Sequence, residues 1–104
     1  MAYDFLGVVI LESLTDPGWL TDHRRLVIER ASDVLAPPGD PYPLWRRRLG
    51  RVASQHVLDV ADELNRHMIP DFYNHFVDSK TLVVVFAGRF FKYWTNTTRA
   101  DGRR

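Results

Sequence analysis

The sequence predicts an α+β fold, in which an antiparallel β-sheet of about four to five strands packs one face against one amphipathic helix over 54–68. Two runs rich in β-branched and aromatic residues, at 5–14 and 81–87, predict strands. Between them, apolar residues recur at helical spacing over 54–68. The polar links that follow the helix are short enough for hairpins, which join antiparallel neighbours.

The composition is that of one small globular domain. A chain of 104 residues is long enough to bury a single modest core. Apolar residues make up 45% of the chain, which separates it from disordered sequences. We therefore expect one α+β domain over 1–94. Residues 95–104 carry no apolar anchor, so we expect a flexible C-terminal tail there.

The same numbers exclude or disfavour several kinds of site and location. The chain has no cysteine, which excludes disulfides, thiolate metal sites and cysteine nucleophiles. The net charge of +1 provides no overall attraction to nucleic acid or acidic membranes. The longest apolar runs, at 5–11 and 82–87, are shorter than the roughly 20 residues of a membrane-spanning helix. We expect a cytoplasmic location, because residues 1–4 lack the basic start of a secretory signal.

The first element is expected to be a buried strand over 5–14. This run is dense in valine, isoleucine and leucine, and it ends at the turn signal of 15–18. Pro17 suits the first position of a short helical turn that carries Trp19 and Leu20. We expect this turn to close one end of the core.

Two segments fit either a strand or a helix. Over 23–35, some apolar residues alternate as in a strand and others recur at helical spacing. Over 44–52, Gly50 argues against an unbroken helix. We favour a strand for both and expect 44–52 to be an edge strand, with a long helix as its alternative. The segment between them, 36–43, is rich in proline and is expected to be a stiff surface loop.

The helix over 54–68 has the strongest local pattern. One face carries apolar residues at i, i+4, i+7 and i+11, namely Val57, Ala61, Leu64 and Met68. Ser54 is expected to be the N-cap, and Pro70 ends the element. The opposite face is charged, so one side should pack and the other should be solvated.

The C-terminal part is expected to form a hairpin and one further extended segment. Strands over 72–77 and 81–87 are joined by the polar turn of 78–80. The second strand is apolar on both faces, so it should lie in the middle of the sheet. A tight turn or bulge at 87–88 then leads into an extended segment over 89–94.

Three segments are similar to known sequences. They are Leu11–Pro17, the strand that contains Trp45, and Phe72-Tyr73-Asn74-His75-Phe76 followed by the run from Val83 to Phe91. Together they resemble a family of small uncharacterised prokaryotic α+β proteins, in which an aromatic-Tyr-x-His-Phe strand precedes a Leu-x-Val-Val-Phe strand. The resemblance covers residues 5–92 and implies a strand at 44–52. It implies a fold and transfers no catalytic residue.

His75 is the first candidate site residue. On a strand it shares a face with Tyr73 and Val77, where its imidazole and the phenol are suited to act as acid, base or ligand anchor. The alternative is a structural histidine that bonds to its neighbours. An enzyme centred on His75 would also need Glu12 or Ser13 nearby, and Ser13 lacks the Gly-x-Ser-x-Gly context of a nucleophile. We assign no catalytic residue.

A basic cluster suggests an alternative function in nucleic-acid binding. It consists of Arg46, Arg47, Arg48 and Arg51. Aromatic residues suited to stacking on single-stranded bases are Tyr42, Trp45, Tyr93 and Trp94. Strand alternation would divide the arginines between two faces, and arginine on an edge strand also discourages aggregation.

The helix offers one pattern compatible with a metal. Asp59, Glu63 and His67 recur at i, i+4 and i+8, a spacing that places oxygen and nitrogen atoms on one side. The same spacing describes a solvated helix face, and no His-Glu-x-x-His signature accompanies it. We expect no metal site and no cofactor.

The sequence favours a non-enzymatic binding or protein-interaction domain that uses an aromatic sheet surface. Aromatic residues crowd the segment 90–94, where some must point outward, and such residues anchor interfaces. The candidate binding residues are Tyr73, His75, Trp45, Arg47, Tyr93 and Trp94. The expected partner is a second copy of the chain or another protein, with no membrane. Nucleic-acid binding and a small enzyme centred on His75 are the alternatives.

Overall fold

The computed structural model describes residues 4–22 and 24–94. Its strands are β1 (Asp4–Ile10), β2 (Leu26–Leu35), β3 (Leu44–Ala53), β4 (Tyr73–Val77), β5 (Thr81–Phe86) and β6 (Arg89–Trp94). Its helices are α1 (Gly18–Asp22) and α2 (Val57–Leu64), with 3₁₀ turns η1 (Leu11–Ser13), η2 (Ser54–His56) and η3 (Asn65–His67).

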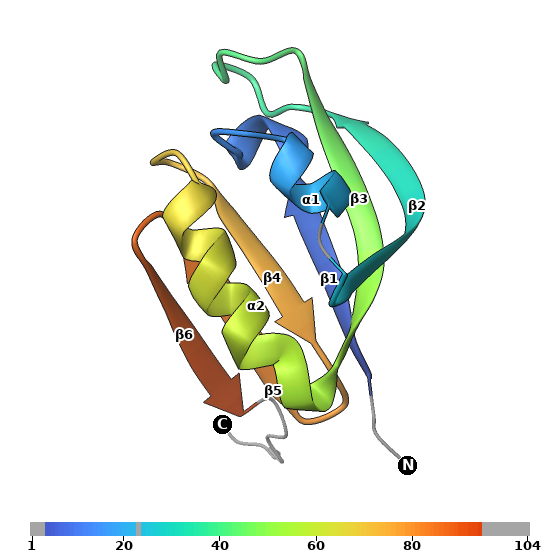
Figure 1. Ribbon diagram of the computed structural model, residues 1–104. Coiled ribbons are helices and arrows are strands. Elements are labelled where there is room, and N and C mark those ends of the chain that lie inside the picture. Colours follow the sequence, from blue (N-terminus) through green and yellow to red (C-terminus); the bar gives the residue numbers. More distant parts are fainter. Residues whose placement is uncertain (1–3, 23, 95–104) are drawn as a thin grey trace.

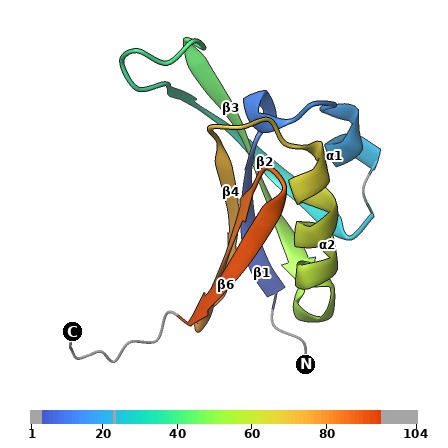
Figure 2. The ribbon, with the colours of Figure 1, turned by 90° about the vertical axis from the view of Figure 1, so that its left-hand side faces the viewer.

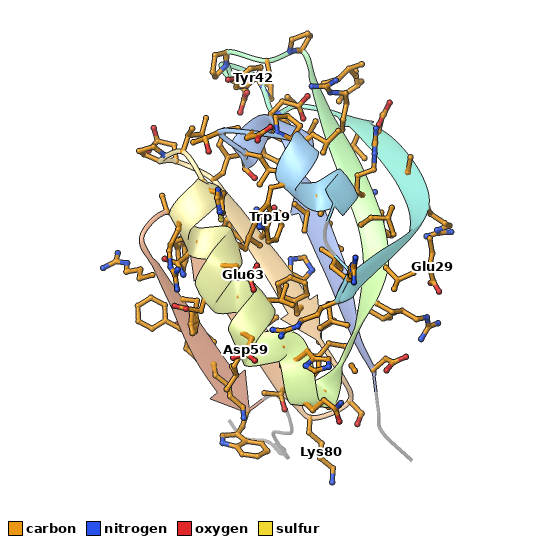
Figure 3. The ribbon with its side chains drawn as sticks, in the orientation of Figure 1. Trp19, Glu29, Tyr42, Asp59, Glu63 and Lys80 are labelled. Carbon is orange, nitrogen blue, oxygen red and sulfur yellow. The ribbon has the colours of Figure 1, made fainter. Side chains whose placement is uncertain are left out.

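The described strands form one antiparallel sheet of six strands, in the order β2-β3-β1-β4-β5-β6. Figure 1 shows α2 lying across this sheet, and Figure 2 shows α1 and α2 on the same side of it. The expected α+β fold, with an antiparallel sheet and one main helix on one face, is confirmed. There are more strands than expected, because both segments that fitted either a strand or a helix are strands and pair with each other.

β3 is an interior strand, so the expectation that 44–52 forms an edge was wrong. It pairs with β2 on one side and with β1 on the other, which leaves β2 at the edge. Arginines had suggested an edge because charged side chains normally avoid a sheet interior. Here the acidic residues of neighbouring elements pair with them, and an interior position is tolerated.

β1 ends at Ile10, although the apolar run continues beyond it. Side chains replace the strand bonds that are lost at this point. The Glu12 carboxylate accepts the backbone N–H of Arg46 at 2.7 Å, and Asn74 Oδ1 accepts that of Ile10 at 2.7 Å. Ser13 Oγ, fully buried, donates to the Ile10 carbonyl at 2.6 Å. The chain therefore turns into η1 without leaving the backbone N–H groups of Ile10 and Arg46 unpaired.

The helical segment runs from 54 to 67, close to the expected 54–68, with η2 and η3 flanking α2. Ser54 is not the N-cap of α2. His56 takes that position and makes no side-chain capping bond. The apolar face packs as expected, and its buried residues are Val57, Val60, Ala61 and Leu64.

The core lies between α2 and the sheet, and a glycine pair lets neighbouring parts approach closely. Gly7 of β1 is opposite Gly50 of β3. A Cβ at Gly7 would lie 2.6 Å from the ring of Phe76, which is fully buried. A Cβ at Gly50 would lie 2.4 Å from the carbonyl oxygen of Val27 in β2. Both positions thus require glycine for packing reasons.

The C-terminal hairpin forms as expected. β4 and β5 pair from Tyr73 opposite Phe86 to Val77 opposite Leu82, and β5 lies between β4 and β6. Gly88, with φ of 87°, turns the chain from β5 into β6. The flexible tail expected over 95–104 lies outside the described residues.

Candidate binding face and pocket

We call the side of the sheet that faces away from α2 the open face. Strand register places one row of side chains across it, formed by Val27, Arg51, Leu6, Val77, Leu82 and Tyr93. The next row is formed by Arg30, Leu49, Val8, His75, Val84 and Phe91. Most of these side chains are apolar, and Leu6, Phe91 and Tyr93 are 41–50% exposed. None of the described elements lies across this face (Figure 2).

One end of the open face contains a pocket of about 250 Å³ between β1, β2, β3 and β4. Four of the six candidate binding residues line it, namely Trp45, Arg47, Tyr73 and His75. These residues are carried by β3 and β4. The two strands lie on either side of β1, so only one strand separates them. Val8 and Ile10 of β1 and Val34 of β2 add aliphatic walls.

The other two candidate residues lie elsewhere. Tyr93 is on the open face, opposite Leu82 of β5. Trp94 is opposite Thr81, whose side chain is buried on the helix side of the sheet. Successive residues of β6 point to opposite faces, so the structure separates Trp94 from the remaining candidates.

The loop before β4 supplies two pocket residues that the sequence did not indicate. Asp71 adopts a left-handed conformation with φ of 76°, and the pocket lining includes both Asp71 and Phe72. The Phe72 ring meets the Trp45 ring edge-on, with centroids 5.9 Å apart, and the Tyr42 ring at 6.0 Å. Tyr42 belongs to the proline-rich loop over 36–43, which therefore contacts the pocket wall. A left-handed aspartate has no clear sequence signal, since such residues are uncommon.

Arg47 and Trp45 are the pocket residues whose N–H groups are not all used in hydrogen bonds to the described residues. Arg47 is half-buried and donates from Nη2 to the Ser32 hydroxyl at 2.8 Å and from Nε to the Ser32 carbonyl at 3.2 Å. Among the described residues, no carboxylate lies within ion-pair distance of it. Trp45 Nε1 is buried and has no hydrogen-bond partner in the described part of the chain. Buried donors without partners are rare in folded proteins and call for an explanation.

His75 contributes a neutral imidazole to the pocket. Burial disfavours its charged form, and the positive charge of Arg47 adds to this effect, so the pKa of His75 lies below 6.5. The ring is therefore uncharged at neutral pH. In that state one nitrogen donates a hydrogen bond and the other accepts one.

An aromatic ladder extends from the pocket across β4, β5 and β6. It consists of Tyr73, Phe86, Phe91 and Tyr93, with successive ring centroids 6.2, 6.0 and 6.4 Å apart. The Arg89 guanidinium lies 5.6 Å from the centre of the Phe91 ring, a cation–π distance. The pocket and the ladder share Tyr73 and form one continuous surface.

The basic cluster is divided and largely neutralised. As alternation predicts, register places Arg47 and Arg51 on the open face and Arg48 on the other, opposite the fully buried Val9. The ion pairs are Arg46 with Glu12 at 2.6 Å, Arg48 with Asp33 at 3.6 Å and Arg51 with Glu29 at 3.1 Å. Burial acts to raise the pKa of Glu12, but the hydrogen bonds from Arg46 outweigh it and hold that pKa below 4.5.

The metal pattern on the helix is not assembled into a site. Among the described residues, no group of three histidine, aspartate or glutamate side chains is arranged to hold a metal ion. Asp59 pairs with Arg25 at 3.5 Å, and the His67 ring stacks on Trp19 with centroids 5.7 Å apart. These contacts give two of the three candidate ligands other partners.

The proposed neighbours of His75 are also held elsewhere. Ser13 Oγ accepts a hydrogen bond at 2.8 Å from Asn74, whose side chain is buried on the helix side of the sheet. His75 is the next residue of β4 and faces the opposite side. Glu12 is held by Arg46. The structure therefore brings His75 together with Tyr73 and Arg47 and separates it from Ser13.

No family model, curated protein or solved structure matches this chain. The resemblance to a family of small prokaryotic proteins stays a prediction. In the part of the chain that the structure describes, none of the helices has the length and apolar character of a membrane span.

Proposed function

We propose that this protein is a non-enzymatic protein-interaction domain, and that its open face packs against the open face of a second copy of the chain. The observation that carries this proposal is the apolar character of a face that the described elements leave uncovered. Burying apolar surface lowers the free energy by about 25 cal/mol per Å², so a partner that covers such a face is bound favourably. A cytoplasmic location belongs to the same proposal.

The size of the face suits a dimer of this chain. Six strands about 4.8 Å apart, with about six residues of about 3.3 Å each, give a projected area of roughly 600 Å². Stable interfaces bury about 800 Å² of accessible surface on each partner. Side chains add relief to the projected area, so the open face has the extent that a stable interface requires.

The side chains also suit self-association. Phe91 and Tyr93 are 41% and 50% exposed on the aromatic ladder, and aromatic residues are enriched at the centres of interfaces. The chain carries a net charge of +1, so two copies repel each other little. Arg51, also on this face, is paired with Glu29 within the same molecule.

Single-stranded nucleic acid is the other occupant that an aromatic ladder suits, because bases stack on aromatic rings. Arg89 beside Phe91 favours it. The ion pairs of Arg46, Arg48 and Arg51 weigh against it, since they leave no continuous basic track along the ladder. We do not propose an enzyme, because Ser13 and Glu12 are engaged away from His75.

Sedimentation equilibrium on the full chain, from about 1 µM to about 500 µM, tests the proposal. The chain offers a matched pair of variants, because Tyr93 and Trp94 are adjacent, exposed and aromatic but lie on opposite faces. We expect the wild type and Trp94→Ser to dimerise. Tyr93→Ser should weaken the dimer at least tenfold.

A wild type that stays monomeric over the whole range would refute the dimer. Equal weakening by both variants would also refute it, because the open face would then not be the interface. Binding of a single-stranded oligonucleotide that fades with salt and is lost in Tyr93→Ser would assign the ladder to nucleic acid instead.

A further inference from the structure

We propose that the pocket between β1, β2, β3 and β4 binds a small planar carboxylate, such as an aromatic monocarboxylic acid, through Arg47 and Trp45. This inference goes beyond the proposed dimer and does not depend on it. It rests on the N–H groups of Arg47 and Trp45 that lack acceptors, on the apolar and aromatic walls around them, and on the size of the cavity.

Arg47 is the cation of this site. Its three basic neighbours on β3 each have a carboxylate partner, whereas the Arg47 side chain donates to the uncharged Ser32. A half-buried guanidinium without a counter-charge is unfavourable, and an anion relieves the cost. The bonds to Ser32 hold two of its five N–H donors, which fixes the plane of the group while other donors stay available.

Trp45 supplies the second donor. It precedes Arg47 by two residues on β3, so both side chains lie on the open face, with Cα atoms roughly 7 Å apart. Its Nε1–H has no acceptor among the described residues, and because this atom is buried the indole ring has to turn toward the cavity for the N–H to meet a ligand. A carboxylate presents two oxygens in one plane and accepts from a guanidinium and a further donor at the same time. The two donors therefore call for the same chemical group.

The walls define the rest of the ligand. Val8 and Ile10 form an aliphatic side, and the Phe72 and Tyr73 rings form an aromatic one. A volume of about 250 Å³ is below the roughly 300–1,000 Å³ of pockets for drug-sized molecules, so the ligand has about one ring. A flat apolar body with one carboxylate meets these requirements.

Two titratable groups complete the lining. His75 is neutral, so it adds a hydrogen-bonding group and no second positive charge, which favours a monoanion over a dianion. Asp71 is exposed and also lines the pocket, where its carboxylate repels the charge of a bound carboxylate, and a second negative charge on the ligand would add to this repulsion. Both features select a ligand with a single negative charge.

Titration of the full chain with benzoate, followed by amide and indole NMR, tests the proposal. The Trp45 Nε1–H resonance should move downfield on binding, while those of the other two tryptophans serve as internal references. Benzamide has the same ring without the charge, and cyclohexanecarboxylate has the charge without the flat ring. Both should bind at least tenfold more weakly than benzoate.

Variants identify the two donors. Arg47→Gln and Trp45→Phe should each weaken benzoate binding at least tenfold, and Arg47→Lys should restore only part of the loss because it lacks the planar fork. Arg51→Gln is the matched control, since Arg51 is on the same strand and face but is paired with Glu29. It should leave the affinity within twofold.

Several outcomes would overturn the proposal. They are an unmoved Trp45 Nε1–H resonance at tens of millimolar benzoate, equal binding of benzamide, and equal losses in Arg47→Gln and Arg51→Gln. The ligand comparison on the wild type decides the question even where a variant fails to fold. Repeating the titration in Tyr93→Ser, which disrupts the dimer interface and keeps the pocket, separates the failure of one proposal from that of the other.

Discussion

The two faces of the sheet are made by the same strands and are both apolar, yet the described elements cover only one of them. On β5, Val83 and Val85 face α2 and are fully buried, whereas Val84 and Phe86 face the other way and are partly exposed. A strand with this pattern is normally buried on both sides. The comparison teaches that an apolar pattern shows which faces need a partner and does not show whether the partner belongs to the same chain.

The largest expected effect is a difference in the free energy of unfolding between substitutions on the two faces. Phe76 is fully buried on the covered face, and Phe91 is 41% exposed on the open face. Phe76→Ala should lower the free energy of unfolding by about 3–5 kcal/mol, because it leaves a cavity in the core. Phe91→Ala should lower it by less than about 1 kcal/mol.

Urea unfolding measures both changes, and it is best done in the Tyr93→Ser background so that the proposed self-association cannot add to stability. Similar losses for the two phenylalanines would contradict the comparison. They would mean that the open face is part of the core of a single molecule.

Local patterns predicted most of the fold. The helix, the hairpin from 72 to 87 and the last strand each depend on residues close together in the sequence, and each formed as expected. The position of β3 inside the sheet could not be predicted, because it depends on pairing with β1, which is separated from it by α1 and β2. The end of β1 at Ile10 was missed for a similar reason, since Asn74 and Arg46 supply its partners from distant parts of the chain.

The candidate site was predicted as single residues and not as an arrangement. Trp45 and Arg47 were selected for nucleic-acid binding, and Tyr73 and His75 for catalysis or ligand anchoring. Only the placement of β1 between β3 and β4 makes them one pocket. The separation of Tyr93 from Trp94 follows from strand alternation alone, so the sequence did carry that signal.

A smaller effect is expected from adding a Cβ at Gly50, where β3 lies close to the backbone of β2. Gly50→Ala should lower the free energy of unfolding by about 1–3 kcal/mol, because the new Cβ would meet the backbone of β2 rather than a side chain that can move. Gly18→Ala is the control. Its Cβ would lie 3.1 Å from Oδ1 of the exposed Asp16 side chain, which accepts the Gly18 N–H and can shift slightly, and we expect a change within about 0.5 kcal/mol.

Denaturant unfolding of both glycine variants measures this difference. A Gly50→Ala protein as stable as the wild type would show that β2 can move away from β3. The edge strand would then be loosely held, and the open face would be less well defined at that edge than at the aromatic ladder.

The smallest expected effect comes from His75, whose titration reports on the open face. Its pKa is lowered in the folded protein, by burial first and by Arg47 second, so the unfolded chain binds the proton more readily. Stability that depends on neutral His75 is therefore complete above about pH 6.5 and is lost as the pH falls through the lowered folded pKa. Between about pH 7.5 and about pH 5.5, the wild type should lose more stability than His75→Gln, by less than about 1 kcal/mol.

An NMR titration of the His75 ring measures its pKa directly. The Arg47→Gln variant tests how much of the lowering comes from the charge of Arg47. Removing the guanidinium should raise the pKa of His75 part of the way toward 6.5, leaving the effect of burial in place. An unchanged pKa in that variant would mean that the charge of Arg47 does not reach the imidazole. A dimer that covers the pocket should instead lower the pKa further as the protein concentration rises, because burial disfavours the charged ring. The ring of His75 thus reports both on Arg47 inside the pocket and on the proposed dimer over the open face.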